Sequence, residues 1–505
     1  MKKRGFNNEK YLNEQSKAII ERAAQFGNKL YLEFGGKLLF DMHAARVLPG
    51  FDPNVKMRLL QKLKDRADIV LCIHAGDIER KKLRADFGIT YDVDALKLID
   101  DIRDWDLNVA GVVITRYDDQ PSVHQFIRRL ERHEIPTYTH RPIKGYPANL
   151  DRIVSDEGYG ANSYIETTKP IVVVTGPGPG SGKMATCLSQ FYHDHKRGVG
   201  CGYAKFETFP IWNLPLKHPV NVAYEAATCD LADFNLIDPH HLEAHGEAAV
   251  NYNRDVEAFP LLKRMLQRIM GEDICYQSPT DMGVNRAGFA IDDDEAVRAA
   301  ATQEIIRRYF RYHCEYAMGF ATRETVDRIE TIMEACDLRP ELRQVVTAAR
   351  EAAAGAREAA GKGHEGVFCG AALELRDGAI VPGRNSPLMH AASSVVLNAT
   401  KRLAGIPREI PLLSNSVIES IARMKQEILE SRNASLSLDE TLIALAISAT
   451  HNPTAQVAIE KLSDLRDCEV HLTHMPTPGD EAGLRRLGVN LTSDPSFAGR
   501  ELFVT

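Results

Sequence analysis

A glycine-rich segment carries the residues of this chain that are best suited to bind a phosphate group. The run "VVVTGPGPGSGKMATCLSQ", residues 172–190, has glycine at 176, 178, 180 and 182 and lysine at 183. Glycines let the backbone approach a ligand closely. Successive N–H groups in such a loop can bind an anion together with the positive end of the following helix. The pattern predicts an anion-binding loop between a strand and a helix.

This loop is similar to the common nucleotide-binding loop, GxxxxGK[ST], but it departs from that motif at two positions. Pro177 takes the place of the first glycine, and Met184 replaces the Ser or Thr whose hydroxyl usually binds Mg²⁺. A Gly-Pro turn that caps a helix, without any ligand, is the alternative interpretation. The residues expected to bind phosphate are Thr175, Gly178, Gly180, Ser181, Gly182, Lys183 and Thr186.

Further charged residues follow the loop and could complete a site for an anionic substrate. Lys205 and Glu207 lie two apart in "YAKFETFPIW", on the same side of a strand, and Arg254 in "NYNRD" offers a guanidinium suited to phosphate or carboxylate. With Lys183 they form the expected catalytic set. The alternative is that they are surface residues or helix caps.

Two aspartates are candidates for holding magnesium. Asp230 and Asp233 lie in "AATCDLADFN", downstream of the loop, where nucleotide enzymes often carry a carboxylate for Mg²⁺. Loop acids that cap turns are an equally good interpretation. The loop and these acids together predict Mg²⁺ and ATP, or another phosphate compound, as cofactors.

A histidine pair raises the question of zinc. "DPHHLEAHGE", residues 238–247, places His241 and His245 four apart, on one face if the segment is helical. Zinc peptidases use HExxH, in which the glutamate activates water. Here Leu242 follows the first histidine and Glu243 falls one position late, so a polar helix start is favoured over a zinc site.

The segments around these motifs predict an α/β fold. Short apolar runs at 29–34, 69–74, 109–115, 136–142 and 169–176 alternate with amphipathic segments, which is typical of a doubly wound parallel sheet. A helical segment and a smaller C-terminal α/β domain follow. The last part begins with a hairpin at an "RDG" turn and ends with a strand, a helix and a strand. The expected domains are 1–255 with the P-loop-like anion site, 256–365 and 366–505.

The composition of the chain argues against some classes of binding partner. The net charge of -7 without a long basic run argues against broad nucleic-acid binding. No run approaches the ~20 apolar residues that span a bilayer. Nine scattered cysteines without a CxxC pair indicate a reducing cytoplasm. We expect a small anionic ligand as the partner, and Ala-rich helices such as 347–366 favour a homo-oligomer.

Several long runs also resemble a known family. "LYLEFGGKLLFDMHAARVLPGF", "VTGPGPGSGKMATCLSQ" and "SPTDMGVNRAGFAI" are similar to an uncharacterised bacterial family of conserved hypothetical proteins of about 500 residues that carry a domain of unknown function. The resemblance implies a multi-domain α/β architecture with a helical segment and a distinct C-terminal domain. Some members carry the label ATP-dependent zinc peptidase, and the family offers no catalytic residues to transfer.

These observations favour a nucleotide- or phosphate-binding enzyme, namely a P-loop-like ligase, kinase or phosphotransferase that acts on a small molecule. A noncatalytic protein that senses a phosphorylated metabolite is the first alternative, since the usual Mg²⁺-binding hydroxyl is absent. A metal-dependent peptidase built on His241 and His245 is a less favoured alternative.

Overall fold

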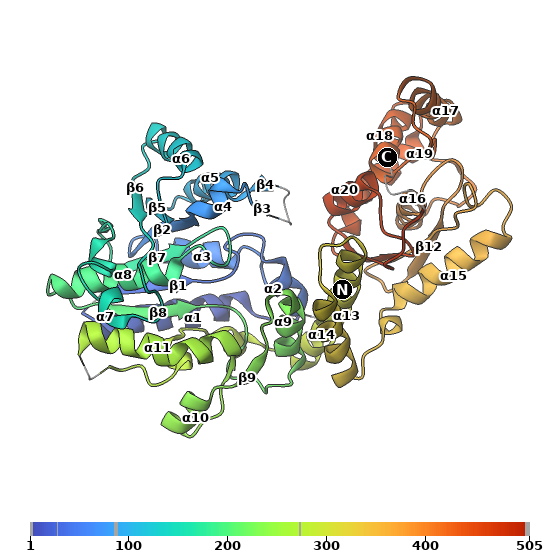
Figure 1. Ribbon diagram of the computed structural model, residues 1–505. Helices are drawn as coiled ribbons and strands as arrows, with labels where there is room; N and C mark the ends of the chain where they lie inside the picture. The colour runs from blue at the N-terminus through green and yellow to red at the C-terminus, as the bar shows by residue number, and fades with distance from the viewer. Residues whose placement is uncertain (1–3, 28, 85–88, 272–273, 500–505) are drawn as a thin grey trace. The chain divides into compact units, whose positions relative to one another are not determined.

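The computed structural model describes residues 4–27, 29–84, 89–271 and 274–499 (Figure 1). The chain forms two compact units. The N-terminal unit comprises the described residues of Lys3–Glu225 and Asp233–Ala301, and the C-terminal unit comprises those of Ala226–Ala232 and Thr302–Thr505. Because contact clusters need not fold independently, the domain boundaries expected at 255 and 365 remain predictions.

The N-terminal unit is built on a sheet of six parallel strands. They are β1 (Leu30–Phe34), β2 (Ala67–His74), β5 (Val109–Thr115), β6 (Thr137–His140), β7 (Ile171–Thr175) and β8 (Gly202–Phe206). Two short antiparallel pairs accompany this sheet, β3 (Leu83–Arg84) with β4 (Ile89–Thr90) and β9 (Asn235–Ile237) with β10 (Val250–Tyr252). The C-terminal unit contains β11 (Gly370–Glu374), β12 (Ile380–Arg384), β13 (Glu469–Leu472) and β14 (Asn490–Ser493).

Helices separate these strands. Those in the first half of the chain are α1 (Asn8–Gln25), α2 (Met42–Val47), α3 (Val55–Lys62), α4 (Ala75–Glu79), α5 (Tyr91–Asp104), α6 (Pro121–Arg132), α7 (Leu150–Ile153), α8 (Lys183–Lys196), α9 (Pro219–Ala227) and α10 (Pro239–His245). Those in the second half are α11 (Asn253–Met270), α12 (Pro279–Met282), α13 (Asp294–Ala317), α14 (Arg323–Ala335), α15 (Gln344–Glu358), α16 (Ala391–Ala404), α17 (Asn415–Arg423), α18 (Leu438–Ala449), α19 (Pro453–Glu460) and α20 (Pro478–Leu487).

The parallel sheet is covered on both faces, which explains its continuous apolar strands. All five residues of β7 are buried. Val172 and Val174 pack in one core cluster with Phe191 of α8 and Leu266 of α11, while Val173 between them points to the opposite face and is also fully buried. The α/β fold with a parallel sheet, predicted from the alternating pattern, is confirmed.

The strand order places β7 in the middle of the sheet. The order is β6-β5-β2-β7-β1-β8. The chain leaves β2 toward β5 on one side, but it leaves β7 toward β8 on the other side. Open α/β sheets bind ligands outside the carboxyl ends of strands whose connections diverge in this way. In this sheet that place is the crevice between β2 and β7, where the glycine-rich loop begins.

The C-terminal unit carries a smaller, mixed sheet with the order β12-β11-β13-β14. β11 pairs antiparallel with β12, as the "RDG" turn predicted, and β13 pairs parallel with β14 across α20. Its core includes Val395 of α16 and Leu484 of α20. The helical segment and the separate mixed sheet expected for the second half of the chain are therefore present.

Two structural features bear on the compositional arguments. Within the described part of the chain, no helix combines the length and the apolar character needed to cross a bilayer. The cysteines are all free, and five of the nine are buried. These thiols are therefore packing residues in the present fold and form no disulfide framework.

Candidate functional site

The carboxyl edge of the parallel sheet gathers most of the charged residues singled out in the sequence. Glu33 of β1 lies between Val174 of β7 on one side and Lys205 of β8 on the other. Neighbouring strands are about 4.8 Å apart, so the ends of β7 and β8 are separated by about 10 Å. The glycine-rich loop and the Lys205–Glu207 pair therefore belong to one edge of the sheet.

The glycine-rich loop 176–182 depends on glycine at several of its positions. Gly180 has a φ of +74° and Gly182 a φ of +90°, both in the left-handed region that glycine tolerates. A Cβ on Gly182 would lie 2.7 Å from the side chain of Thr115, and one on Gly176 would lie 2.4 Å from the carbonyl oxygen of Cys72. Thr115 also donates its hydroxyl to the carbonyl of Ser181 at 2.8 Å. The ends of β2 and β5 thus hold the loop in place.

Several polar groups of this loop have no partner. Among the described residues, none accepts a hydrogen bond from the backbone N–H groups of Gly178, Gly180, Ser181 or Gly182. The hydroxyl oxygens of Ser181 and Thr175 are buried and also lack a hydrogen bond. Buried polar groups are nearly always satisfied, so the two hydroxyls call for a partner. The three glycines among the free N–H groups are exposed or partly buried, where an anion can reach them.

The remaining loop residues are placed differently from a standard nucleotide loop. Lys183 donates from Nζ to the carbonyl of Gly178 at 3.3 Å, so its ammonium group folds back over the loop. Thr186 is fully buried and accepts a hydrogen bond from the Cys72 thiol at 3.4 Å. Met184 packs against the core. In this arrangement the side chains of 184 and 186 do not supply the hydroxyl that usually binds Mg²⁺.

Lys205 lies at the centre of a partly buried polar cluster. Its Nζ donates to Asp255 Oδ1 at 2.7 Å, lies 3.4 Å from Glu207 Oε1 and also contacts the hydroxyl of Tyr252. Tyr252 and Asp255 come from the end of β10 and the start of α11, and they close over the end of β8. We call Lys205, Glu207, Tyr252 and Asp255 the Lys205 cluster.

The charges of the Lys205 cluster are unbalanced, and the pKa of Glu207 shows the consequence. Burial raises the pKa of Glu207, and the charges of Asp255 and Glu33 raise it further against the opposing effect of Lys205, to about 7. Burial by itself would lower the pKa of Lys205, but Asp255 and Glu207 outweigh it and hold that pKa well above its ordinary value. A carboxyl with a pKa near neutrality beside a permanent cation can both accept and donate a proton.

The Lys205 cluster opens onto a pocket of about 320 Å³. Gly283 forms a parallel bridge with Lys205 near the end of β8, and this bridge brings the segment after α12 to the pocket wall. The residues that line the pocket include Arg22, Lys205, Glu207, His241, His245, Asp255, Asp281 and Arg286. Two sequence motifs that are 34 or more residues apart, the Lys205–Glu207 pair and the histidine pair, therefore face one cavity.

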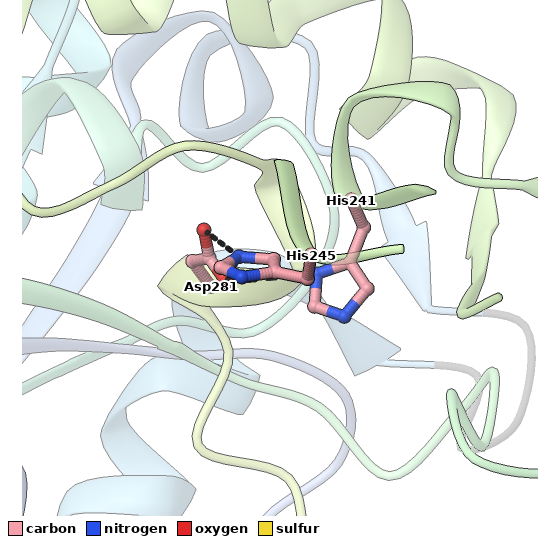
Figure 2. A group of neighbouring side chains, drawn as sticks. All are labelled: His241, His245 and Asp281. Atoms are coloured by element: carbon pink, nitrogen blue, oxygen red, sulfur yellow. Dashed lines mark hydrogen bonds and ion pairs between the residues drawn. The ribbon is translucent and has the colours of Figure 1, made fainter. Parts of the chain in front are cut away.

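Both histidines lie on α10 and contact a carboxylate that comes from another helix (Figure 2). His245 Nε2 is 2.9 Å from Asp281 Oδ1, and His241 Nδ1 is 3.5 Å from the same oxygen. One ligand atom from each residue lies within 4.8 Å of the other two. Leu242 and Glu243 are exposed, and neither lines the pocket. The structure thus gives the pair a third polar partner, although not the glutamate of an HExxH motif.

Local capping interactions fix this arrangement. Asp238 caps α10 through Oδ1, which accepts the N–H groups of His240 and His241, while its Oδ2 accepts the hydroxyl of Thr280 at 2.7 Å. The side chain of Asp281 accepts the N–H of Ser278 in a capping box that starts α12. One aspartate therefore links the starts of the two short helices that carry the histidines and Asp281.

The other candidates of the sequence analysis have separate partners. Asp230 accepts a hydrogen bond from the hydroxyl of Tyr312 at 3.1 Å, in the C-terminal unit. Asp233, in the N-terminal unit, forms an ion pair with Arg254 at 2.6 Å. Neither acid lines the pocket. Their role with Mg²⁺ stays a prediction, as does that of Arg254.

Sequence reasoning missed several pocket residues. Asp255 directly follows Arg254, and Asp281 lies in a Ser-x-x-Asp capping box that could be recognised as a helix start. Arg22, on α1, gave no local signal. Only the folded contacts bring these residues to the pocket.

Comparisons with known proteins place the chain in a family. A family model described as domain of unknown function DUF1846, N-terminal, matches residues 4–337, and the corresponding C-terminal model matches residues 341–503. A UPF0371 protein of Clostridium tetani is 56% identical over 499 residues, which are 99% of each chain. A UPF0371 protein of Clostridium botulinum shows the same identity and coverage. The resemblance to a bacterial family of unknown function is confirmed, and the chain belongs to the DUF1846 family.

Proposed function

We propose that this protein is an enzyme that binds a small molecule by its phosphate group at the loop 176–183. The chemistry takes place at Glu207, about 10 Å away along the sheet edge. The phosphate is a handle in this proposal and is not itself transferred. The observation that carries the proposal is the set of unpartnered donors in the loop at the point where the sheet connections diverge.

The electrostatics of the loop support an anionic ligand. The 14-residue helix α8 starts at Lys183, so its positive end points at the loop. Among the described residues, the Lys183 ammonium group donates a hydrogen bond to a loop carbonyl and makes no ion pair with a carboxylate. Its ammonium group can therefore move to a phosphate without breaking a salt bridge, while the N–H groups of Gly180 and Gly182 bind the oxygens.

The missing hydroxyl favours a handle over nucleotide hydrolysis. In nucleotide-hydrolysing loops the Ser or Thr after the lysine binds Mg²⁺ beside the phosphates. Here that position is Met184, whose side chain packs against the core. The hydroxyl of Thr186 accepts a hydrogen bond from the Cys72 thiol. A phosphate bound at this loop would keep its bonds while another part of the ligand reacts.

The Lys205 cluster supplies groups suited to proton transfer. Glu207 has a pKa of about 7, so a large share of the molecules carries either form at neutral pH. Lys205 can stabilise a negative charge that develops on the ligand. Tyr252 contacts both side chains and orients them.

Calorimetric titration with inorganic phosphate, Mg-ATP and Mg-GTP tests the loop. We expect wild type to bind at least one of the three, and Lys183→Ala to weaken that binding by about tenfold or more, since charge-assisted hydrogen bonds contribute about 1.5–3 kcal/mol. Lys196→Ala is the matched control, because it removes a lysine at the other end of α8. No binding by folded wild type, or an equal loss in both variants, would remove the basis of the proposal.

Glu207→Gln distinguishes an enzyme from a noncatalytic sensor. A sensor is the second candidate function because the hydroxyl that usually binds Mg²⁺ is absent from the loop. In an enzyme, this variant keeps phosphate binding and loses turnover of a ligand found by screening phosphorylated metabolites. In a sensor, wild type binds the same ligand without turnover. A product detected by mass spectrometry for wild type and not for Glu207→Gln supports the enzyme.

A further inference from the structure

The histidine pair and Asp281 form a group that phosphate binding at the loop does not use. Two of the separations between their ligand atoms are 2.9 and 3.5 Å. Atoms that lie 2.0–2.1 Å from one tetrahedral ion are about 3.3 Å apart. The side chains therefore stand at nearly the spacing that one metal ion requires, and a small movement of the exposed His245 completes it (Figure 2).

Residues around the group hold its side chains in place, as the partners of metal ligands do in metal sites. The backbone N–H groups of Gln277 and Ser278 hold Asp281 Oδ2, which leaves Oδ1 facing the two histidines. Ser278 Oγ lies 3.0 Å from His241 Nδ1 and would yield that nitrogen to the ion. The Asp238 link between α10 and α12 sets the distance between the two helices. Partners that orient the ligands in this way reduce the cost of ordering them when an ion binds.

The pocket beside this group also contains two cations without an anionic partner. Arg22 donates from Nη2 to the carbonyl of Gly283 at 3.3 Å, while its Nη1 is buried and has no hydrogen bond. Arg286 stacks on Phe289, at 5.4 Å from the ring centre. Neither arginine pairs with a carboxylate among the described residues, so both remain available to an anion.

We propose that His241, His245 and Asp281 bind a divalent first-row transition metal ion such as zinc. The ion and the two arginines together bind a small molecule that carries a carboxylate or phosphate group. Two imidazoles and one carboxylate suit zinc, iron and manganese. Three protein ligands leave a coordination position open toward the pocket, as in catalytic sites. This proposal reverses the expectation against zinc and does not depend on the loop.

Metal binding by the full chain tests the first part. Protein stripped with EDTA is titrated with Zn²⁺ in a calorimeter and with Co²⁺ by visible absorption. We expect one equivalent of either ion, with the visible bands of nitrogen and oxygen ligands for Co²⁺. His245→Ala should weaken binding by more than about 100-fold, because even changes in supporting residues cost about 10–100-fold.

His240→Ala is the matched control, since this histidine is on the same helix but faces Phe259. It should leave metal binding unchanged. Asp281→Asn, which keeps an oxygen for the capping box, should weaken binding as His245→Ala does. Absence of stoichiometric binding by folded wild type overturns the proposal, and so does an equal loss in His240→Ala.

The anion is tested on the Co²⁺-loaded Lys183→Ala variant, in which the loop cannot contribute. Oxalate and inorganic phosphate are added separately, and we expect at least one of them to shift the visible bands. Arg286→Ala in the same background should weaken the affinity for that anion, as measured from the band shift, by about tenfold or more. It should leave Co²⁺ binding unchanged. A response to oxalate alone assigns a carboxylate ligand, and one to phosphate alone assigns a phosphate ligand. Bands that neither anion shifts would overturn the anion part.

Discussion

Each unit of the protein contains a cluster of charged side chains, buried in the C-terminal unit and partly buried in the N-terminal unit, and the two clusters are built differently. In the C-terminal unit, Glu469 Oε1 and Oε2 both accept hydrogen bonds from Arg307, and Oε2 also accepts one from Arg343 at 2.7 Å. Glu304 accepts from Arg307 and Arg308. We call these five residues the Arg343 cluster. Every carboxylate in it faces two guanidinium groups.

The Lys205 cluster has the opposite proportion of charges. Lys205 is shared between Asp255 and Glu207, and Glu33 adds its negative charge from the neighbouring strand. Burial raises the pKa of Glu207 most, and because one ammonium group cannot neutralise these carboxylates, the charges of Asp255 and Glu33 raise it further, to about 7. The cluster also opens onto the pocket.

This difference separates charges that hold a fold together from charges that can do chemistry. Arg343 donates to Glu469, Thr492 and two backbone carbonyls, so four of its five N–H donors are used, and its side chain is only 1% exposed. Such pairing fixes strands β13 and β14 but leaves no group to react. A carboxyl that is kept incompletely neutralised beside a cavity is typical of functional sites.

The largest effect should come from Arg343→Met, which removes the most buried guanidinium group of the Arg343 cluster. We expect a loss of about 3–5 kcal/mol in the free energy of unfolding, because Glu469 is left buried with fewer partners. Urea unfolding measures the change. Arg350→Met is the control on α15, the helix that Arg343 directly precedes. Its ion pairs with Glu341 and Asp494 are more exposed, so we expect at most about 1 kcal/mol. Equal losses would contradict a structural role specific to Arg343.

Glu207→Gln should act in the opposite direction. The pKa of Glu207 rises from 4.5 to about 7 on folding, so protonation favours the folded state. Its favourable contribution is complete below about pH 4.5 and is lost as the pH rises through about 7. Gln resembles the protonated form. We expect it to stabilise the protein by about 1–3 kcal/mol at pH 8 and to have little effect at pH 5.

Glu469→Gln sharpens this test. Its carboxylate is fully paired, so the change should destabilise the protein at both pH 5 and pH 8, by about 1–3 kcal/mol. Urea unfolding at the two pH values gives the comparison. A stability gain for Glu207→Gln that does not change with pH would show that packing, and not the raised pKa, is responsible.

Much of the N-terminal unit could be predicted from local sequence. β7 and β5 are apolar runs with the length of buried strands, and the pairing of Lys205 with Glu207 follows from the two-residue period of a strand. The sheet order could not be predicted. β7 enters between β1 and β2 long after both in the chain, and no local pattern records that long-range choice.

The pocket was predictable only in part for the same reason. The i, i+4 spacing of His241 and His245 could be read directly, but Asp281 comes from a helix start 36 residues later. Its Ser-Pro-Thr-Asp sequence predicts a cap, and the cap is present. That the same carboxylate also meets two histidines depends on the Asp238 link between the two helix starts, which is a tertiary contact.

The smallest expected change in stability concerns two glycines that share a backbone conformation, one in each unit. Gly180 has a φ of +74° in the loop, and Gly405 has a φ of +66° at the end of α16. A Cβ at either position would meet nothing within 4 Å. Alanine should therefore cost about 1 kcal/mol of stability in both, from the left-handed strain alone.

Ligand binding then distinguishes the two positions. The Cβ of Gly180→Ala would occupy the open space that a phosphate would enter to reach the N–H groups of the loop, so we expect this variant to weaken phosphate binding several-fold. Gly405→Ala should bind like wild type, because Gly405 only ends a helix of the C-terminal unit. Thermal unfolding gives the stability change, and calorimetry gives the affinity. Equal affinities in the two variants would show that the loop glycine serves only to turn the chain, and the Gly-Pro turn would then be the better account of residues 176–182.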